Sequence, residues 1–156
     1  MTLPSLSMNR RQASIAGALW LFAVRPARAL DNRTLDASLQ QAMRAWSGSA
    51  TPRAGRVTLT VAELIDNGNL VPLRVSVNSP MTPADHVQEI MLLNERNPGR
   101  ELARFQLSPA SGRAEVSTRV RLATSQHLVA LARMSDGSVW QHTVEVVVTL
   151  AACIES

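Results

Sequence analysis

The sequence of 156 residues contains no lysine, no tyrosine and a single cysteine, Cys153. One cysteine cannot form a disulfide within the chain, and the sequence has neither a Cys-x-x-Cys nor a His-x-x-x-His pair for a metal. Beyond residue 29, only Trp46, Phe105 and Trp140 are aromatic, which is too few for a surface that stacks sugars or bases. These absences argue against disulfide scaffolds, zinc modules and stacking-based binding modules.

The chain carries a formal charge of +4, but that excess lies in its first 29 residues. Arg10, Arg11, Arg25 and Arg28 lie there without any acidic residue. The remaining 12 arginines equal the 12 acidic residues in number, so the rest of the chain is neutral. A nucleic-acid module keeps a basic face on its folded part, so we do not expect nucleic acid as a partner.

No catalytic motif is present, since the chain lacks a glycine-rich phosphate loop and a metal-binding pair. The three histidines, His86, His127 and His142, are far apart in sequence. His142 falls on the apolar side of the last predicted strand, where we expect a hydrogen-bonded core or interface histidine. We therefore predict no catalytic residue, no metal site and no cofactor.

The first 29 residues have the form of an export signal. Arg10-Arg11 precede an apolar run over Ala13–Val24, and Ala27-Arg28-Ala29 matches a small-x-small cleavage site. The run has 12 residues, whereas a membrane-spanning helix needs about 20. The adjacent arginines favour the twin-arginine route over an ordinary signal. We expect the mature chain to begin near Leu30 and to work in the periplasm.

Residues 30–55 are predicted to form one helix and a linker. Thr34 is a candidate N-cap with Asp36 in the first turn, and the helix should end near Ser47-Gly48. One face of this helix is apolar, with Leu35, Leu39, Ala42, Met43 and Trp46 at helical spacing.

From Arg56 the apolar period changes to two, which predicts strands. Turn residues recur every 8 to 12 positions between about seven such segments, near residues 57–61, 71–77, 87–93, 103–107, 116–122, 126–134 and 138–150. Pro72 belongs at the start or edge of its strand. This spacing is typical of an immunoglobulin-like antiparallel β-sandwich. We therefore predict a mainly β fold over 56–150 with one N-terminal helix.

Cys153 lies in a short tail, residues 151–156, directly after the last strand. Chain ends at the rim of a sheet are usually exposed, and an unpaired cysteine in an exported protein suggests a reactive thiol or an intermolecular bond. No Lys, Arg or His in the tail lowers its pKa, so activation has to come from a partner. An inert thiol is the alternative.

Several segments together resemble one family. They are the twin-arginine leader, the helix, Ala62–Leu73, Asn97-Pro98, Phe105, Ser117–Leu122, Asp136-Gly137 and the lone cysteine after the last strand. This order resembles SoxY, the sulfur-carrier subunit of the periplasmic thiosulfate-oxidising (Sox) system, over nearly the whole mature chain.

The resemblance implies a carrier that catalyses nothing itself. It implies a heterodimer with SoxZ, a second immunoglobulin-like subunit, and covalent attachment of substrate at Cys153. A haem enzyme would join thiosulfate to that cysteine as an S-thiosulfonate, and a sulfate-releasing hydrolase would act next. Neither enzyme would bind permanently, and no membrane contact is implied.

The tail departs from the family pattern, Gly-Gly-Cys-Gly-Gly. Here it reads Ala151-Ala152-Cys153-Ile154-Glu155-Ser156, which is stiffer and bulkier than a glycine arm. Two alternatives to the carrier therefore stay open. The chain could be a divergent structural or binding subunit with Cys153 in an intermolecular disulfide, or an unrelated exported sandwich.

Overall fold

The computed structural model describes residues 35–152. The predicted leader (1–29), the candidate cap Thr34 and the cysteine of the tail lie outside these residues. Within the described part, the elements in chain order are α1 (Ala37–Ser47), β1 (Arg53–Ala54), β2 (Val57–Val61), β3 (Leu64–Ile65), β4 (Val71–Val77), β5 (Val87–Asn94), β6 (Glu101–Gln106), the 3-10 helix η1 (Pro109–Ser111), β7 (Glu115–Val120), β8 (Gln126–Met134) and β9 (Val139–Val148).

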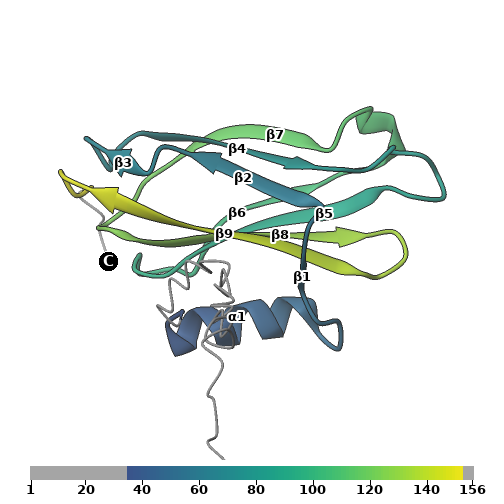
Figure 1. Cartoon of the computed structure of the whole chain (residues 1–156), viewed down its shortest axis with the longest axis horizontal. Helices are drawn as coiled ribbons and strands as arrows, with labels where there is room; N and C mark the ends of the chain where they lie inside the picture. Colours follow the sequence, from purple (N-terminus) through teal and green to yellow (C-terminus); the bar gives the residue numbers. More distant parts are fainter. Residues whose placement is uncertain (1–34, 153–156) are drawn as a thin grey trace, which may run out of the picture. The chain divides into compact units, whose positions relative to one another are not determined.

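Two sheets face each other (Figure 1). The smaller has the order β2-β4-β7, and the larger has the order β1-β9-β8-β5-β6, with β3 also paired to β9. The long strands pair antiparallel, whereas the two-residue strands β1 and β3 run parallel to β9. The predicted mainly β sandwich with one N-terminal helix is confirmed.

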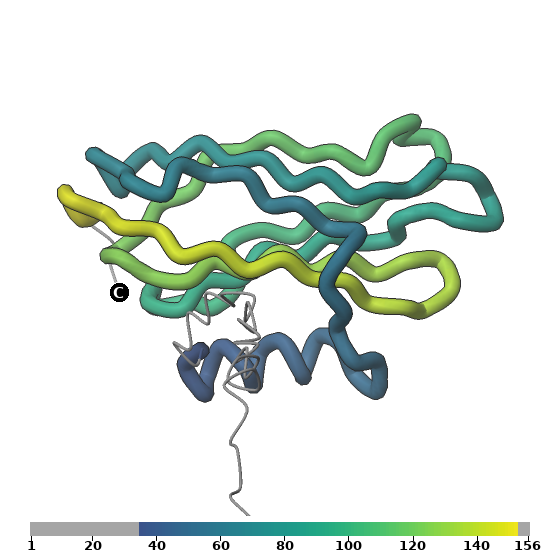
Figure 2. The backbone as a smooth tube through the Cα atoms, in the orientation of Figure 1, coloured from purple at the N-terminus to yellow at the C-terminus, as the bar shows by residue number. Residues whose placement is uncertain are grey.

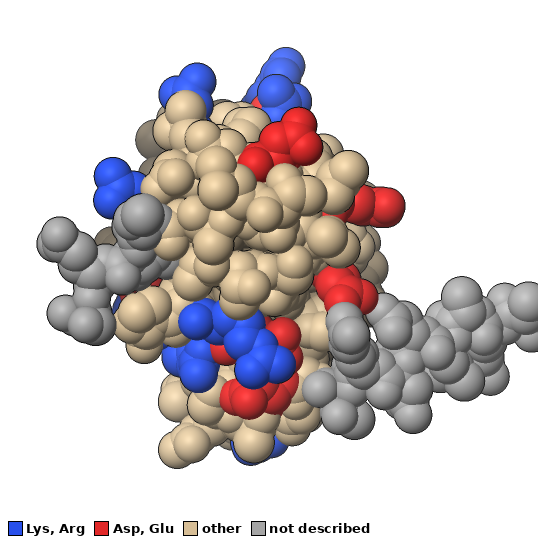
Figure 3. All heavy atoms as spheres, turned by 90° about the vertical axis from the view of Figure 1, so that its left-hand side faces the viewer, with Lys and Arg blue, Asp and Glu red and all other residues tan. Residues whose placement is uncertain are grey.

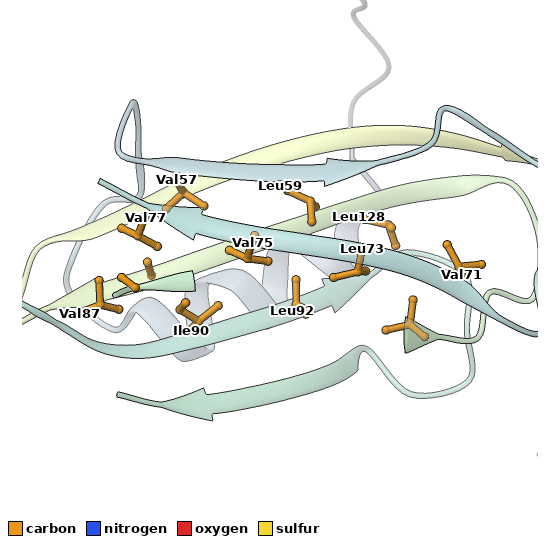
Figure 4. Packing of buried hydrophobic residues seen from close by; sticks show 14 of the residues in the cluster. Val57, Leu59, Val71, Leu73, Val75, Val77, Val87, Ile90, Leu92 and Leu128 are labelled. Atoms are coloured by element: carbon orange, nitrogen blue, oxygen red, sulfur yellow. The ribbon is translucent and has the colours of Figure 1, made fainter. Parts of the chain in front are cut away.

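The core between the sheets follows from the period of two. In β4, residues 71, 73, 75 and 77 are buried while the residues between them face outward. Figure 4 shows side chains of both sheets pointing toward one another in this layer: Val57, Leu59, Val71, Leu73, Val75 and Val77 from the smaller sheet, and Val87, Ile90, Leu92 and Leu128 from the larger. Pro72 stands at the start of β4, beyond the last residue paired with β2, as predicted.

Helix α1 covers the outer face of the larger sheet (Figure 1). Leu39 and Met43 pack there against Met91, Val129 and Leu131 in a second apolar layer. This layer explains why β5 and β8 lack alternation: both of their faces are buried. No helix of residues 35–152 has the length and hydropathy needed to cross a membrane.

The helix termini differ slightly from the prediction. Asp36 is the N-cap residue rather than a first-turn residue, and its Oδ1 accepts the Ser38 N–H at 2.8 Å. Hydrogen bonds from the hydroxyl and the backbone of Ser38 lower the pKa of Asp36. Gly48 ends the helix with a φ of 62°, a conformation that favours glycine, as its position in the sequence indicated.

Two short strands were not predicted. β1 lies inside the segment that we interpreted as a linker, and β3 precedes the turn at Asp66–Asn69. A two-residue strand has no readable period, and a parallel partner far along the chain leaves no hairpin signal. Both strands lie along β9, the strand that leads to the tail.

Candidate functional site

The last strand is held on both sides where it approaches the tail. On one side, the Val147 N–H donates to Glu63 O at 2.7 Å and the Thr149 N–H donates to Ile65 O at 2.9 Å. On the other side, the Val148 N–H donates to Ser125 Oγ at 2.9 Å. The short strand β3 therefore extends the sheet to the point at which the tail begins.

Gly68 joins the tail to the loop after β7. Its N–H donates to Leu150 O at 2.8 Å, and its own carbonyl accepts the Leu122 N–H at 2.9 Å. A Cβ at this position would lie 2.4 Å from Leu122 O and 3.0 Å from Ala152 N. Only glycine allows these three backbone segments to approach so closely.

Ala152 is the last described residue, and it is fixed by the same loop. Its N–H donates to Leu122 O at 3.1 Å, and the residue is buried. In Figure 2 the end of the described chain lies between the turn that contains Gly68 and the loop after β7. The expectation of an exposed tail holds for Ala151 but is wrong for Ala152, because backbone hydrogen bonds hold this residue against the sandwich. We call residues 149–152 with Gly68 and Leu122 the tail base.

A buried polar cluster fixes the loop that carries Leu122. Asn97 Nδ2 donates to Arg121 O at 2.8 Å, and Asn97 Oδ1 accepts the Ala123 N–H at 2.9 Å. Gln126 Nε2 donates to the same Asn97 Oδ1 at 3.1 Å. The Asn97 side chain thus supplies the hydrogen bonds that a neighbouring strand would otherwise give to this loop. It thereby positions the Leu122 carbonyl, which accepts the Ala152 N–H.

Glu95 connects this cluster to the helix. Its Oε1 accepts the Asp36 N–H at 2.9 Å, and its Oε2 lies 2.9 Å from His127 Nδ1. Burial opposes the ionisation of Glu95, but the hydrogen bonds from Asp36 and His127 outweigh it and hold the pKa of this carboxyl below its usual value. Helix α1, β8 and the turn after β5 are therefore tied together by one carboxylate.

The three histidines are not brought together. His127 is paired with Glu95. His86 directly precedes β5, and its Nδ1 lies 3.1 Å from Thr82 O in the preceding loop. The Nδ1 of His142 accepts the Leu59 N–H at 2.9 Å across the two sheets. The hydrogen bond expected for this histidine is confirmed, and its side chain is half-buried. Within residues 35–152, no three His, Cys, Asp or Glu side chains are close enough to hold a metal ion.

Arg119 and Arg121 precede Leu122 of the tail base, and they do not line one common site. Arg119 lines a shallow depression of about 630 Å³ on the outer face of the smaller sheet, beside Pro72, Arg74 and Ser117. Arg121 is exposed next to Leu122. No residue of the described tail lines the depression.

Sequence reasoning missed the roles of Gly68, Leu122 and Asn97. All three lie in segments that carried the family resemblance, and their positions were visible as turn residues or as part of a strand. Their common function could not be read from the sequence, because Gly68 and Leu122 act through backbone atoms and the Asn97 side chain binds a loop about 25 residues further along the chain.

Comparison with known proteins agrees with this arrangement. A sequence model of "Sulfur oxidation protein SoxY" matches residues 43–153. The sulfur carrier protein SoxY from Chlorobium limicola f thiosulfatophilum superposes with a TM-score of 0.61 and 27% identity, covering 74% of this chain and 100% of that chain. No curated protein sequence matches the chain significantly.

Other solved structures share the fold alone. Superoxide reductase (neelaredoxin) from Ignicoccus hospitalis has a TM-score of 0.54 and 22% identity, over 60% of this chain and 80% of that chain. Superoxide reductase from Nanoarchaeum equitans has a TM-score of 0.53 and 14% identity, over 62% and 100%. At these sequence identities, the structural similarity shows a shared fold and does not assign the chemistry of superoxide reductases to this chain. The family match covers most of the chain, including every segment of the tail base, and the chain belongs to the family of the sulfur oxidation protein SoxY.

Proposed function

We propose that this protein is a covalent carrier of sulfur-oxidation intermediates, with Cys153 as the attachment residue. The observation that carries the proposal is the fixed tail base. Ala152 is bound through its N–H to Leu122 O, and the next residue in the sequence is the only cysteine. A thiol that must enter the active sites of other enzymes benefits from a rigid support, because a defined exit position reduces the entropy lost on binding.

The loading step follows from thiol chemistry. The thiol of Cys153 and the terminal sulfur of thiosulfate form one S–S bond, and one proton and two electrons leave. The two electrons pass one at a time to the haem groups of a separate loading enzyme. A hydrolase then adds water across the bond between the sulfonate and the neighbouring sulfur, which releases sulfate and leaves a cysteine persulfide without further oxidation. In this scheme the carrier contributes no catalytic group.

The same proposal includes a cellular setting. The predicted leader over residues 1–29, with its twin arginines, supports a periplasmic location. The family resemblance suggests a SoxZ-like immunoglobulin-fold subunit as the permanent partner. The haem enzyme and the sulfate-releasing hydrolase are transient partners. We propose no cofactor for the chain itself.

The altered tail supports one alternative. Ile154 stands beside the thiol where the family has glycine, and its β-branched side chain would obstruct entry into a narrow channel. A carrier that had lost this entry would use Cys153 for an intermolecular disulfide, as a structural or binding subunit.

The intact mass of the protein, after incubation with thiosulfate and the loading enzyme, distinguishes these functions. We expect an added thiosulfonate that reductant removes and that the Cys153→Ser variant cannot form. A disulfide to another chain would support the alternative. A free thiol under all conditions would contradict the carrier.

A further inference from the structure

Four large apolar side chains are exposed in the described part of the chain, and all four belong to segments around the tail base. Leu64, Leu70, Val147 and Leu150 expose between 50% and 62% of their surface. Leu64 and Val147 are register partners between β3 and β9. Leu70 follows Gly68 by two residues, and the Leu150 carbonyl accepts the Gly68 N–H. We call these four residues the tail-base patch.

The surrounding surface includes an uncharged area. Figure 3 shows this end of the sandwich: uncharged surface occupies its middle, and a cluster of basic and acidic side chains lies directly below it. Single exposed apolar residues are ordinary on protein surfaces, but a group of them at one place marks an interaction site.

The covalent geometry limits what can cover this patch. Cys153 directly follows Ala152, whose N–H is bound to Leu122 O. One Cα–Cα step of 3.8 Å and the length of a cysteine side chain place the sulfur within about 7 Å of the Ala152 Cα. While Ala152 stays bound, an enzyme that reacts with this sulfur must therefore lie against the end of the sandwich that carries the patch.

We infer that the tail-base patch is the docking surface for the enzyme that loads Cys153, and that this enzyme carries apolar side chains around its active-site entrance. This inference rests on the proposed carrier function. The inference adds a surface that binds the loading enzyme but takes no part in the reaction of the thiol.

The size of the patch fits a transient partner. Four side chains that are somewhat more than half exposed offer on the order of 300 Å² of apolar surface. A stable protein–protein interface covers about 800 Å² on each partner. The patch is too small to support a permanent subunit contact alone, whereas a carrier that must leave each enzyme after one reaction requires a weak contact.

The test uses the full chain paired with its partner subunit and the purified haem loading enzyme, with thiosulfate as the second substrate. Leu64→Thr combined with Val147→Thr removes half of the patch and places a β-branched residue, which suits a strand, at both positions. We expect the KM for the carrier to rise about tenfold, with kcat unchanged. The reaction of Cys153 with a small maleimide should proceed at the wild-type rate, because that reagent needs no docking surface.

A matched control lies at the opposite end of the sandwich. Ala110→Thr introduces the same residue type in η1, at an exposed position far from the tail base, and should leave the KM unchanged. A binding measurement on the Cys153→Ser background gives a readout independent of turnover. There the double variant should bind the loading enzyme about tenfold more weakly than its parent.

Several results would overturn the inference. An unchanged KM in the double variant, with the wild-type protein loaded normally, would contradict the docking inference and leave the carrier function intact. Loss of the SoxZ-like subunit from the double variant would make the patch a permanent interface. Concentration-dependent self-association abolished by the same substitutions would assign the patch to a second copy. Failure to load the wild-type protein would contradict the carrier function, and the docking inference with it.

Discussion

Among single residues, Glu95 is the carboxylate that ties the polar cluster to helix α1 and β8. It accepts backbone hydrogen bonds from Asp36 and His127 and is 5% exposed. Glu95→Gln should lower the free energy of unfolding by about 1–3 kcal/mol at pH 7. The reason is that the glutamine NH2 group would face the N–H groups of Asp36 or His127, to which it cannot hydrogen-bond as an acceptor. Urea unfolding of both proteins measures this difference. Glu101→Gln, at an exposed ion pair with Arg104, should change stability by less than about 0.5 kcal/mol.

The pH dependence of this effect has a defined sign. The pKa of Glu95 is lower in the folded protein, so its contribution is fully present above the unfolded value of about 4.3 and is lost as the pH falls through the folded value. The stability difference between wild type and Glu95→Gln should therefore shrink from pH 6 toward pH 3. An equal difference at every pH would show that the charge of Glu95 is not the cause.

His142 makes a contact that crosses the two sheets. Its Nδ1 accepts the N–H of Leu59, a buried residue at the edge of the smaller sheet. His142→Leu should cost about 1–3 kcal/mol, because it leaves this backbone donor without an acceptor. His142→Asn can place an amide oxygen near the same position and should recover part of the loss in thermal unfolding. Equal destabilisation by both substitutions would mean that packing, not the acceptor, explains the effect.

For the turn between β3 and β4, the structure makes glycine obligatory at position 68. Gly68→Ala would place its Cβ 2.4 Å from Leu122 O, so either the turn or the tail must move. We expect a loss of about 1–3 kcal/mol and a faster reaction of Cys153 with maleimide, since the tail base is loosened. Both are measured on the purified chain.

Gly99 provides the matched control for this substitution. It lies in the turn after β5, a Cβ there would meet nothing within 4 Å, and its φ is not in the left-handed region. Gly99→Ala should therefore be neutral, or should stabilise the protein by up to about 1 kcal/mol because alanine lowers the conformational entropy of the unfolded chain. If Gly68→Ala and Gly99→Ala changed stability and maleimide reactivity equally, the close backbone approach at the tail base would not explain why position 68 needs glycine.

The long strands could be predicted because each alternates against a core or is buried on both faces. Strand β4 shows the first pattern and β8 the second. The short strands β1 and β3 could not be predicted, since their pairing with β9 depends on tertiary contacts and not on a local period. The support of the tail was hidden for a similar reason: Gly68 contributes no side chain, and its partners Leu122 and Leu150 bind it through backbone atoms.

For the folded body as a whole, the open question is where the stable domain begins. The sequence suggested a sandwich over 56–150, preceded by a separate helix and linker, and this boundary stays a prediction. In the structure, α1 contributes Leu39 and Met43 to an apolar layer with β5, β8 and β9. The family match also begins inside this helix, at residue 43.

A chain that starts at residue 56 should therefore fail to form a stable monomer. It would expose the outer face of the larger sheet, including Met91, Val129 and Leu131, each 1% exposed or less. Burial of Leu39 and Met43 alone contributes about 4–5 kcal/mol, which is comparable to the whole stability of a small domain. We expect the chain 56–156 to bind a hydrophobic dye and to associate, whereas 35–156 should unfold cooperatively. Leu39→Ala in the longer chain isolates the contribution of the helix and should cost about 2–4 kcal/mol. A cooperative, monomeric 56–156 chain would show that the sandwich is stable without its helix, and that α1 serves the partner subunit instead.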